Sequence, residues 1–548
     1  MTDNKQTTDI EEKNAIGQNL NDKEATYDHV LKYTGLFGGV QGLTLLMGMA
    51  RNKLVALLIG PAGLGFINMY NTVASLIHQS TNLGIGFSAV RHISELSEQG
   101  DYKAISDYAK TIRTWSLLTA IFGTIICCIL SHQISFWSFE NYDYTLEFCL
   151  LSPIIGFMAI TAGELAIMKG LKQLKKVAMS SACGALATLI VCIPIYSLLG
   201  ISGIVTSLLL CNLASLAITL FYSLQIIPWR VDMKSVSSLI NGIPMVKLGI
   251  GYIIAGIFGQ GAEYIIRTLI QQYSDIAHVG LYNSGYIMMV SYASMVFVAM
   301  EADFFPRLSA ACNDTVRSNK IINQQMEICV LLIAPILICF VLSMPYMVKI
   351  LYSDKFMAAV PMSISATLFM FFRALTLPVA YLPLAKGDSK MFMATELFYD
   401  IFIAVAVPFA FKNYGLLGAG WAISAGGFMY FVIIHTLYRF KYKFIFSPRL
   451  LYIYISQFVL LITTIIIALY VNGSSPELFK ALDFFNILGD NNTVIHSKLH
   501  PSMTFVKWGI GLTTLSISVY LSLRILRRET NIISTIKTKI KSKIGAHE

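Results

Sequence analysis

Five basic side chains stand inside stretches of this sequence that are otherwise apolar. Ionisable groups are costly in hydrocarbon, and the few that a membrane protein keeps there commonly have a function. A guanidinium meets two oxygens of an anion with its planar fork, while a lysine supplies a point charge. The set therefore predicts a cationic site for an anionic group that is sheltered from bulk water. Its members are Arg51, Lys53, Lys247, Arg267 and Arg373.

Each of these residues also has a simpler explanation. The two lysines could extend their long side chains to the membrane surface, and Arg51 could mark the end of a short first span. Arg267 follows Glu263 by four residues, so the two share one face of a helix and could neutralise each other. Arg373 has no acidic neighbour in its apolar stretch. An isolated guanidinium there needs an anion or water.

Carboxylates in apolar stretches are candidates for ion coupling, because such a group can take up and release a proton or another cation. Glu263, Glu396 and Asp400 are the candidates, and the last two are one helical turn apart. His78 is a fourth candidate and could equally be a polar residue satisfied by its neighbours. Three further carboxylates, nearer the ends of their stretches, are predicted to be interfacial: Glu164, Glu301 and Asp303.

The elements that position these residues are predicted to be transmembrane helices. Hydrophobic residues make up 55% of the 548 residues and charged residues 13%, whereas soluble domains carry about 25% charged residues. A span needs about 20 mainly apolar residues. This length predicts an all-α polytopic membrane protein with about fourteen transmembrane helices. The predicted spans are 34–59, 66–90, 114–134, 146–168, 177–198, 201–224, 243–271, 278–304, 325–348, 358–385, 391–411, 415–438, 450–471 and 503–523.

The lysines and arginines predict the orientation of these spans. If the N-terminus is cytoplasmic, the cytoplasmic segments hold 30 of the 41 Lys and Arg residues and the external segments hold 5. Basic residues collect in cytoplasmic loops. The distribution therefore predicts that both termini are cytoplasmic and that the long loop 472–502 is external.

Two stretches of the sequence resemble each other at an offset of a little over 200 residues. Residues 65–71 and 90–94 bracket the second span, and residues 279–283 and 306–309 bracket the eighth. A repeat of six spans keeps its orientation, so it predicts two parallel six-helix lobes around a central cavity, followed by two extra helices. The predicted parts are a disordered cytoplasmic tail 1–30, an N-terminal lobe 31–224, a linker 225–242, a C-terminal lobe 243–440, two extra helices in 441–523 and a basic cytoplasmic tail 524–548.

These motifs resemble those of the polysaccharide flippases of the multidrug/oligosaccharidyl-lipid/polysaccharide exporter superfamily, most closely the Wzx-type O-antigen translocases. Residues 51–65, 279–283 and 305–309 carry the resemblance, which covers about 30–440. The last two spans depart from a twelve-span pattern and are similar to the fourteen-span lipid II flippase.

The resemblance implies a flippase that moves an undecaprenyl-diphosphate-linked oligosaccharide from the cytoplasmic to the outer leaflet of the bacterial inner membrane by alternating access. The five basic residues would then bind the diphosphate. It also implies a polysaccharide polymerase and chain-length proteins as partners.

Other classes of protein are less well supported by the residues. A drug exporter of the same superfamily carries small cations, which an arginine-rich cavity does not favour. A membrane glycosyltransferase is expected to have acidic metal ligands in its first external loop, but residues 60–65 carry no charge. A polymerase is expected to have Arg or His in a large external loop, where only His496 and His500 are found. The nine cysteines lack metal-site spacing, and no motif predicts a metal, a cofactor or nucleic acid.

Overall fold

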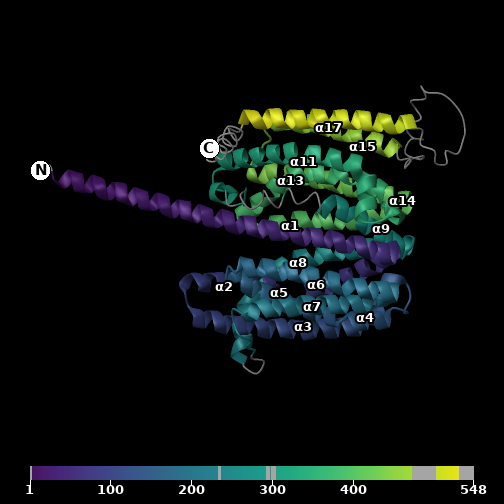
Figure 1. Cartoon of the computed structure of the whole chain (residues 1–548), viewed down its shortest axis with the longest axis horizontal. Helices are drawn as coiled ribbons and strands as arrows, with labels where there is room; N and C mark the ends of the chain where they lie inside the picture. Colours follow the sequence, from purple (N-terminus) through teal and green to yellow (C-terminus); the bar gives the residue numbers. More distant parts are fainter. Residues whose placement is uncertain are drawn as a thin grey trace, which may run out of the picture. The chain divides into compact units, whose positions relative to one another are not determined.

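The computed structural model describes residues 3–231, 236–291, 297, 304–305, 307–471 and 501–529. All regular structure in these ranges is helical (Figure 1). Nine stretches of the described chain are long and apolar enough to cross a membrane. The prediction of an all-α polytopic membrane protein is confirmed. These stretches are Gly42–Thr81, Tyr102–Phe139, Thr145–Gly170, Leu174–Leu224, Thr315–Leu351, Thr367–Ala385, Ser389–Tyr442, Pro448–Leu469 and Trp508–Ile525.

Three of the nine stretches hold two predicted spans each, because glycine interrupts the helix. Helix α1 (Asp3–Thr81) breaks at Gly60, with φ 66° and ψ −167°. Helix α14 (Ser389–Tyr442) breaks at Gly415, with φ 59° and ψ −150°. The stretch 174–224 turns at Gly200 between α6 (Leu174–Leu199) and α7 (Ile204–Leu224). Two predicted spans are not among the nine. Span 243–271 lies within α8 (Val236–Tyr273), and span 278–304 begins in α9 (Ile276–Tyr286).

The chain divides into two compact units. Unit 1 comprises residues 1–59 and 73–257, and unit 2 comprises residues 60–72 and 258–548. Their boundaries differ from the predicted lobes at two places. Residues 60–72 pack in unit 2, and α8 is shared, with its residues up to 257 in unit 1. Helix α1 also begins at Asp3, in the stretch predicted to be a disordered tail. That stretch has no proline, the residue that disfavours a helix most strongly.

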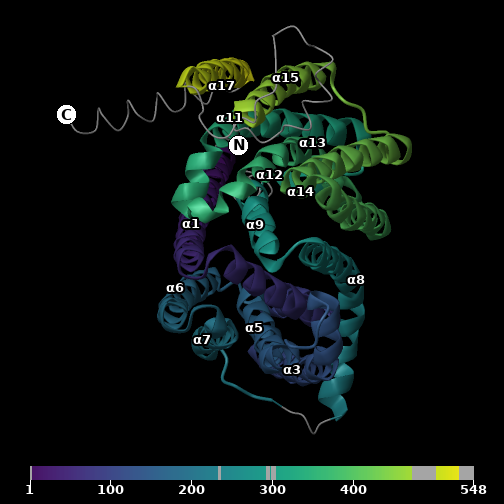
Figure 2. The same ribbon diagram turned by 90° about the vertical axis from the view of Figure 1, so that its right-hand side faces the viewer.

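Unit 1 contains most of α1 and the helices that follow it as far as α7. Its core is made by apolar residues of α2 (Ile85–Gln99), α3 (Tyr102–Phe139) and α5 (Pro153–Gly170). Helices α6 and α7 lie side by side (Figures 1 and 2). The short helix α4 (Thr145–Leu151) follows the turn after α3 and ends before Pro153, which begins α5.

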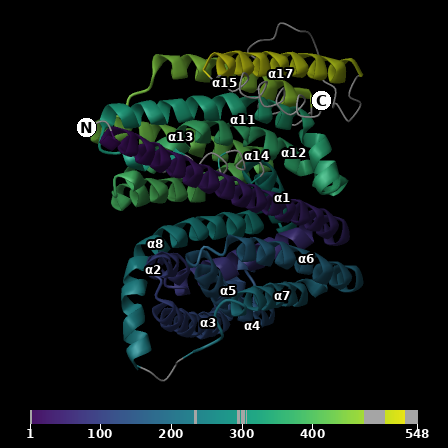
Figure 3. The ribbon, with the colours of Figure 1, turned by 60° about the vertical axis from the view of Figure 1, so that its left-hand side comes forward.

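Unit 2 is built around α11 (Thr315–Leu351). Helix α11 packs against α13 (Thr367–Ala385), α15 (Pro448–Val471) and α17 (Pro501–Glu529), and α15 also packs on α17 (Figure 3). The amide of Gln457 on α15 accepts a 2.6 Å hydrogen bond from the Ser518 hydroxyl on α17. The smaller elements of this unit are η2 (Ile287–Ser291), η3 (Asp354–Ala359) and α12 (Val360–Ser365).

The internal repeat recurs as local backbone geometry. Asp101 caps α3 and Asp314 caps α11, each accepting hydrogen bonds from the backbone N–H groups of the second and third residues of its helix. Positive φ angles recur 215 residues apart, at Lys172 (56°) and Gly387 (75°), and at Gly200 and Gly415 (both 59°). The same turns therefore connect corresponding helices of the two repeats.

Candidate functional site

Arg267 is the centre of a charged cluster in unit 2. Its Nη2 lies 2.8 Å from Oε2 of Glu263, one turn earlier on α8. The same nitrogen donates a 3.0 Å hydrogen bond to Oδ1 of Asn283 on α9, and Nη1 donates a 2.6 Å hydrogen bond to Oγ1 of Thr72. The Arg267 and Glu263 side chains are 12% and 20% exposed. The pair expected from the i,i+4 spacing is therefore formed, and Arg267 is tied to three elements.

Thr72 and Asn283 reach Arg267 because two segments of unit 2 meet without side chains between them. A Cβ added to Gly65 would lie 1.9 Å from the carbonyl oxygen of Ile276, and one added to Gly280 would lie 2.0 Å from that of Pro61. Only glycine allows this approach. Gly65 and Gly280 are 215 residues apart, as are Pro61 and Ile276, so the contact is reciprocal between repeats. Gly65 and Gly280 belong to the repeat motif found in the sequence, so each copy of the motif contributes one glycine to the contact.

Arg373 lies on α13 and is half-buried. Its Cζ is 5.9 Å from the centroid of the Phe369 ring. Its Nε is buried without a hydrogen-bond partner, and no carboxylate in the described part of the chain lies within ion-pair distance. Arg373 acts electrostatically on Tyr286, Tyr399 and Tyr430, so it belongs to the same cluster.

The carboxylates predicted on α14 complete the cluster. Glu396 accepts a short hydrogen bond from the hydroxyl of Tyr430. Asp400 packs against α8, since a Cβ added to Gly259 would be 3.6 Å from its Oδ2. Asp400 is also close enough to Glu396 and Glu263 to interact electrostatically with both. Three carboxylates and two arginines predicted separately are thus gathered in one unit.

The remaining predicted residues belong to unit 1. Arg51 is exposed and acts electrostatically on Cys192, Tyr196 and Cys211 of α6 and α7. Lys53 is partly exposed. The side chain of Lys247 lies outside the described part of the structure. The role of all three in substrate binding stays a prediction.

His78, also in unit 1, has one ring nitrogen engaged. Its Nε2 lies 3.4 Å from Nδ2 of Asn82, while Nδ1 is buried without a hydrogen-bond partner among the described residues. This environment is consistent with either expectation for His78.

A buried ion pair in unit 1 was missed from the sequence. Arg113 and Glu164 are both 1% exposed and form a bidentate pair, with N–O distances of 2.7 and 3.0 Å. Ser223 donates a short hydrogen bond to the same carboxylate, and the guanidinium also binds the carbonyl oxygens of Ile227 and Pro228. Glu164 is therefore buried inside the unit, where a partner 51 residues away compensates its charge. Its position relative to the membrane surface stays a prediction. The only sign of this ion pair in the sequence is a glutamate inside a predicted span without a basic residue one turn away.

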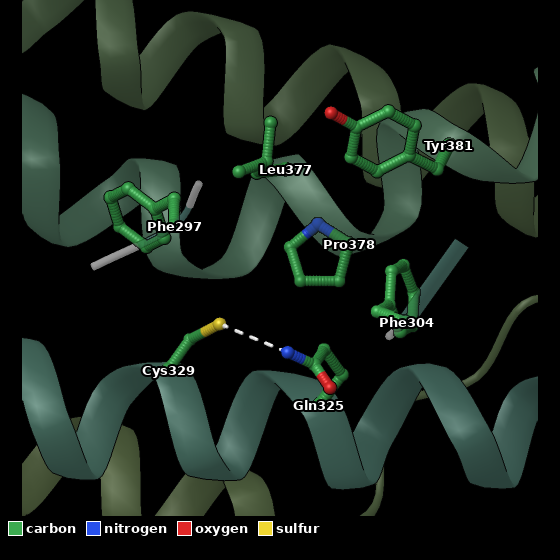
Figure 4. Close-up of a pocket in the computed structure, with 7 residues that line it drawn as sticks. All are labelled: Phe297, Phe304, Gln325, Cys329, Leu377, Pro378 and Tyr381. Carbon is green, nitrogen blue, oxygen red and sulfur yellow. Dashed lines mark hydrogen bonds between the residues drawn. The ribbon is translucent and has the colours of Figure 1, made fainter. Parts of the chain in front are cut away.

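At the corresponding place, the described residues of unit 2 form a small pocket and no such ion pair (Figure 4). Gln325 follows the capping residue of α11 by eleven residues, as Arg113 follows that of α3 by twelve. Its amide points toward Cys329, with 4.0 Å between Nε2 and Sγ. Pro378, on the helix that carries Arg373, lies opposite. The other lining residues are apolar or aromatic: Phe297, Phe304, Leu377 and Tyr381. The two repeats therefore have similar turns but different side chains at this place: an ion pair in unit 1 and a largely apolar pocket in unit 2.

Comparison with known proteins agrees with this architecture. A family model described as polysaccharide biosynthesis protein matches residues 54–361. The chain belongs to this family. The match begins at Leu54 within the first resembling motif and spans both copies of the repeat motif. No curated protein sequence matches the chain.

Solved structures show the same fold at low sequence identity. Lipid II flippase MurJ in an inward closed conformation has a TM-score of 0.64 and 14% identity, covering 90% of this chain and 99% of that one. A multidrug resistance MATE family transporter of the MOP superfamily, facing inward, has a TM-score of 0.59 and 15% identity, covering 73% and 94%. A MOP superfamily transporter from Pyrococcus furiosus has a TM-score of 0.51 and 15% identity, covering 74% and 93%. The chain therefore has the fold of MOP-superfamily transporters.

Proposed function

We propose that this protein is a flippase that moves an undecaprenyl-diphosphate-linked oligosaccharide, such as an O-antigen repeat unit, from the cytoplasmic to the outer leaflet. Membership of a polysaccharide biosynthesis family and a transporter fold support a lipid-linked glycan as substrate. The protein would work in the bacterial inner membrane with both termini cytoplasmic. A polysaccharide polymerase and chain-length proteins would take up its product.

Arg373 is the observation that carries this proposal. A half-buried guanidinium with an unsatisfied Nε and no carboxylate partner among the described residues has donors to offer an anion. A diphosphate presents oxygens that accept the fork of such a side chain. Arg267, by contrast, already uses both terminal nitrogens on Glu263, Thr72 and Asn283. We therefore assign headgroup binding first to Arg373 and second to Arg267.

The same cluster supports a role for a coupling cation. Glu263, Glu396 and Asp400 outnumber the two arginines, so the fully ionised cluster would carry one excess negative charge. An uncompensated charge is costly in a low-dielectric site. We infer that one carboxylate holds a proton or another cation. We also infer that this cation and the diphosphate bind and leave in turn during transport, because each changes the charge of the cluster.

Two rival functions are less well supported. A hydrolytic enzyme would need a histidine relay, and Ser274, Asp275 and His278 do come together in unit 2. Both partners, however, lie on the same ring nitrogen, with Ser274 Oγ at 2.9 Å and Asp275 Oδ1 at 2.8 Å from Nδ1. The imidazole cannot relay a proton between groups that share one nitrogen. Export of small cations does not account for the available donors of Arg373.

Deletion of the gene tests the proposed substrate. Loss of a flippase should leave the lipid-linked glycan on the cytoplasmic leaflet, where mass spectrometry of the extracted lipids identifies its sugars. Accumulation of an undecaprenyl-diphosphate oligosaccharide supports the proposal. Accumulation of lipid II would assign the protein to the lipid II flippases. An unchanged lipid pool with higher sensitivity to cationic drugs would favour a drug exporter.

A further inference from the structure

We propose that Cys128 and Cys149 form a disulfide that joins α3 to α4 at the external end of unit 1. Their Sγ atoms lie 2.8 Å apart. This is closer than a non-bonded contact between sulfur atoms, and a bond of about 2.05 Å needs less than 1 Å of further approach. The proposal is independent of the transported substrate.

The register of the two helices holds the sulfur atoms together. Helix α3 runs toward the turn and α4 runs back from it, and the two pack on each other (Figures 1 and 3). His132 and Thr145, each one turn nearer the turn than the cysteines, face each other with 3.5 Å between Nδ1 and Oγ1. The cysteine pair is therefore the second step of an antiparallel register and not an isolated close approach.

Cys127, next to Cys128 in the chain, is a buried packing residue and differs from the proposed pair. Cys127 is 3% exposed and directs its Sγ toward the carbonyl oxygen of Phe148, 3.8 Å away. Cys128 is exposed and Cys149 partly exposed on the surface of unit 1, so neither thiol is enclosed by the packing of the unit. The sequence shows only that the nine cysteines lack metal-site spacing. The structure separates this pair from Cys127.

The predicted topology places the pair toward the external ends of spans three and four. The turn 140–144 connects spans three and four, which the Lys/Arg distribution makes external. Tyr142 in this turn stacks on His132 at 4.1 Å and on Phe136 at 5.2 Å, as aromatic residues do at a membrane interface. Cys149 is four residues into α4, about 6 Å of helix rise from its start. Disulfides persist in such extracytoplasmic compartments.

The oxidation would proceed by exchange with the disulfide of an exported thiol oxidase. The thiolate of one cysteine attacks that disulfide, forms a mixed disulfide and releases one oxidase thiolate. The second cysteine's thiolate then attacks the sulfur of the first and releases the other. The oxidase leaves as a dithiol, having taken two electrons, and the two protons lost by Cys128 and Cys149 are taken up by its thiolates.

Thiol counting in cells tests the proposal. Cells are lysed in a denaturant that contains N-ethylmaleimide, so that every free thiol is blocked, and the full-length protein is then reduced and labelled with a maleimide–polyethylene glycol. Wild-type chains that run as monomers without reductant should gain two polymer adducts. Cys128→Ser and Cys149→Ser chains should gain none, while the control Cys339→Ser should still gain two.

Wild-type chains that gain no adduct would overturn the proposal. This holds even if copper-phenanthroline closes the bond in isolated membranes, because the bond would then be possible but absent in the cell. One adduct on either single variant would also overturn it, since the cysteine would then be joined to another molecule.

Discussion

At the scale of single residues, Arg373 and Arg267 differ in the contacts of their terminal nitrogens. Nε of both side chains is buried without a hydrogen-bond partner among the described residues, but both terminal nitrogens of Arg267 are engaged by neighbouring side chains. Replacing a residue that only stabilises the fold should lower the abundance of the protein. Replacing a residue that binds substrate should lower transport while the protein still inserts at its normal level.

We predict that Arg373→Ala lowers transport roughly ten- to a hundredfold without changing protein abundance. A hydrogen bond to a charged group contributes about 1.5–3 kcal/mol. Arg373→Lys should recover only part of the activity, because a point charge does not reproduce the bidentate fork. Arg230→Ala, at an exposed position, is the control. Surface glycan and membrane abundance are measured together; normal glycan in Arg373→Ala cells would contradict the assignment.

We predict that Arg267→Gln lowers abundance, because Glu263 is left partly buried without its partner. The double variant Glu263→Gln/Arg267→Gln should recover abundance, since both charges are removed. Its transport rate then separates two roles. Normal transport would make Arg267 only the partner of Glu263. Poor transport at normal abundance would add a role in binding.

Sequence spacing reveals pairs within one helix and misses those between helices. Glu263 and Arg267 could be paired from their i,i+4 spacing alone. Arg113 and Glu164 are 51 residues apart, Glu396 and Tyr430 are 34 apart, and Arg267 and Thr72 are 195 apart. No helical period connects such residues. Only the packing of the helices brings them together.

At the scale of helices, the Arg113–Glu164 pair fixes the segment after α7 to α3 and α5. Arg113 binds the carbonyl oxygens of Ile227 and Pro228, and its Cζ lies 5.0 Å from the ring centroid of Trp229. Glu164→Gln should therefore lower stability, as removal of one partner from a buried ion pair costs about 3–5 kcal/mol. The melting temperature in detergent measures the loss.

The matched control for this change is Glu95→Gln. Glu95 pairs with Arg91, but their side chains are 50% and 67% exposed, and such pairs contribute little. Hydrogen bonds from Arg91 nevertheless lower the pKa of the Glu95 carboxyl. If Glu164→Gln melts at the same temperature as Glu95→Gln, the buried pair does not hold the segment.

We predict that Gly65→Ala and Gly280→Ala separate the two segments that meet in unit 2. Each new methyl group would sit about 2 Å from a backbone carbonyl oxygen, which cannot turn away as a side chain can. The melting temperature and transport should both fall. Gly261→Ala, on α8, has no atom within 4 Å of its added Cβ and should leave both unchanged. Equal behaviour of the three variants would contradict a close glycine contact.

The sequence predicts most helices because their lengths and apolar character are local properties. All the spans expected in the described residues coincide with helices. The unit boundaries were harder to predict, because residues 60–72 continue α1 in the chain but pack with α9. The packing of residues 60–72 in unit 2 depends on the contact between Gly65 and Ile276, which cannot be predicted from a hydropathy pattern.

At the scale of the whole molecule, the asymmetric distribution of Lys and Arg predicts the orientation. A cysteine introduced at Lys390, in a chain without its other reactive cysteines, should resist a membrane-impermeant maleimide in intact cells. Lys390 is exposed and suits this test better than Lys441, which lies 2.5 Å from Asp388 and, with Tyr442, lowers the pKa of Asp388 to about 2. A cysteine at Ser474, outside the described residues, should be labelled. The reverse pattern would invert the topology.

The central claim is that the protein transfers a lipid-linked glycan between leaflets and leaves it chemically unchanged. Purified protein in liposomes with an undecaprenyl-diphosphate oligosaccharide in the inner leaflet provides the direct measurement. The glycan should become accessible to an added lectin or glycosidase at a rate that depends on the protein, and Arg373→Ala should slow that rate. The mass of the untreated lipid should stay the same. Exposure no faster than in protein-free liposomes, or a cleaved or lengthened glycan, would contradict the account.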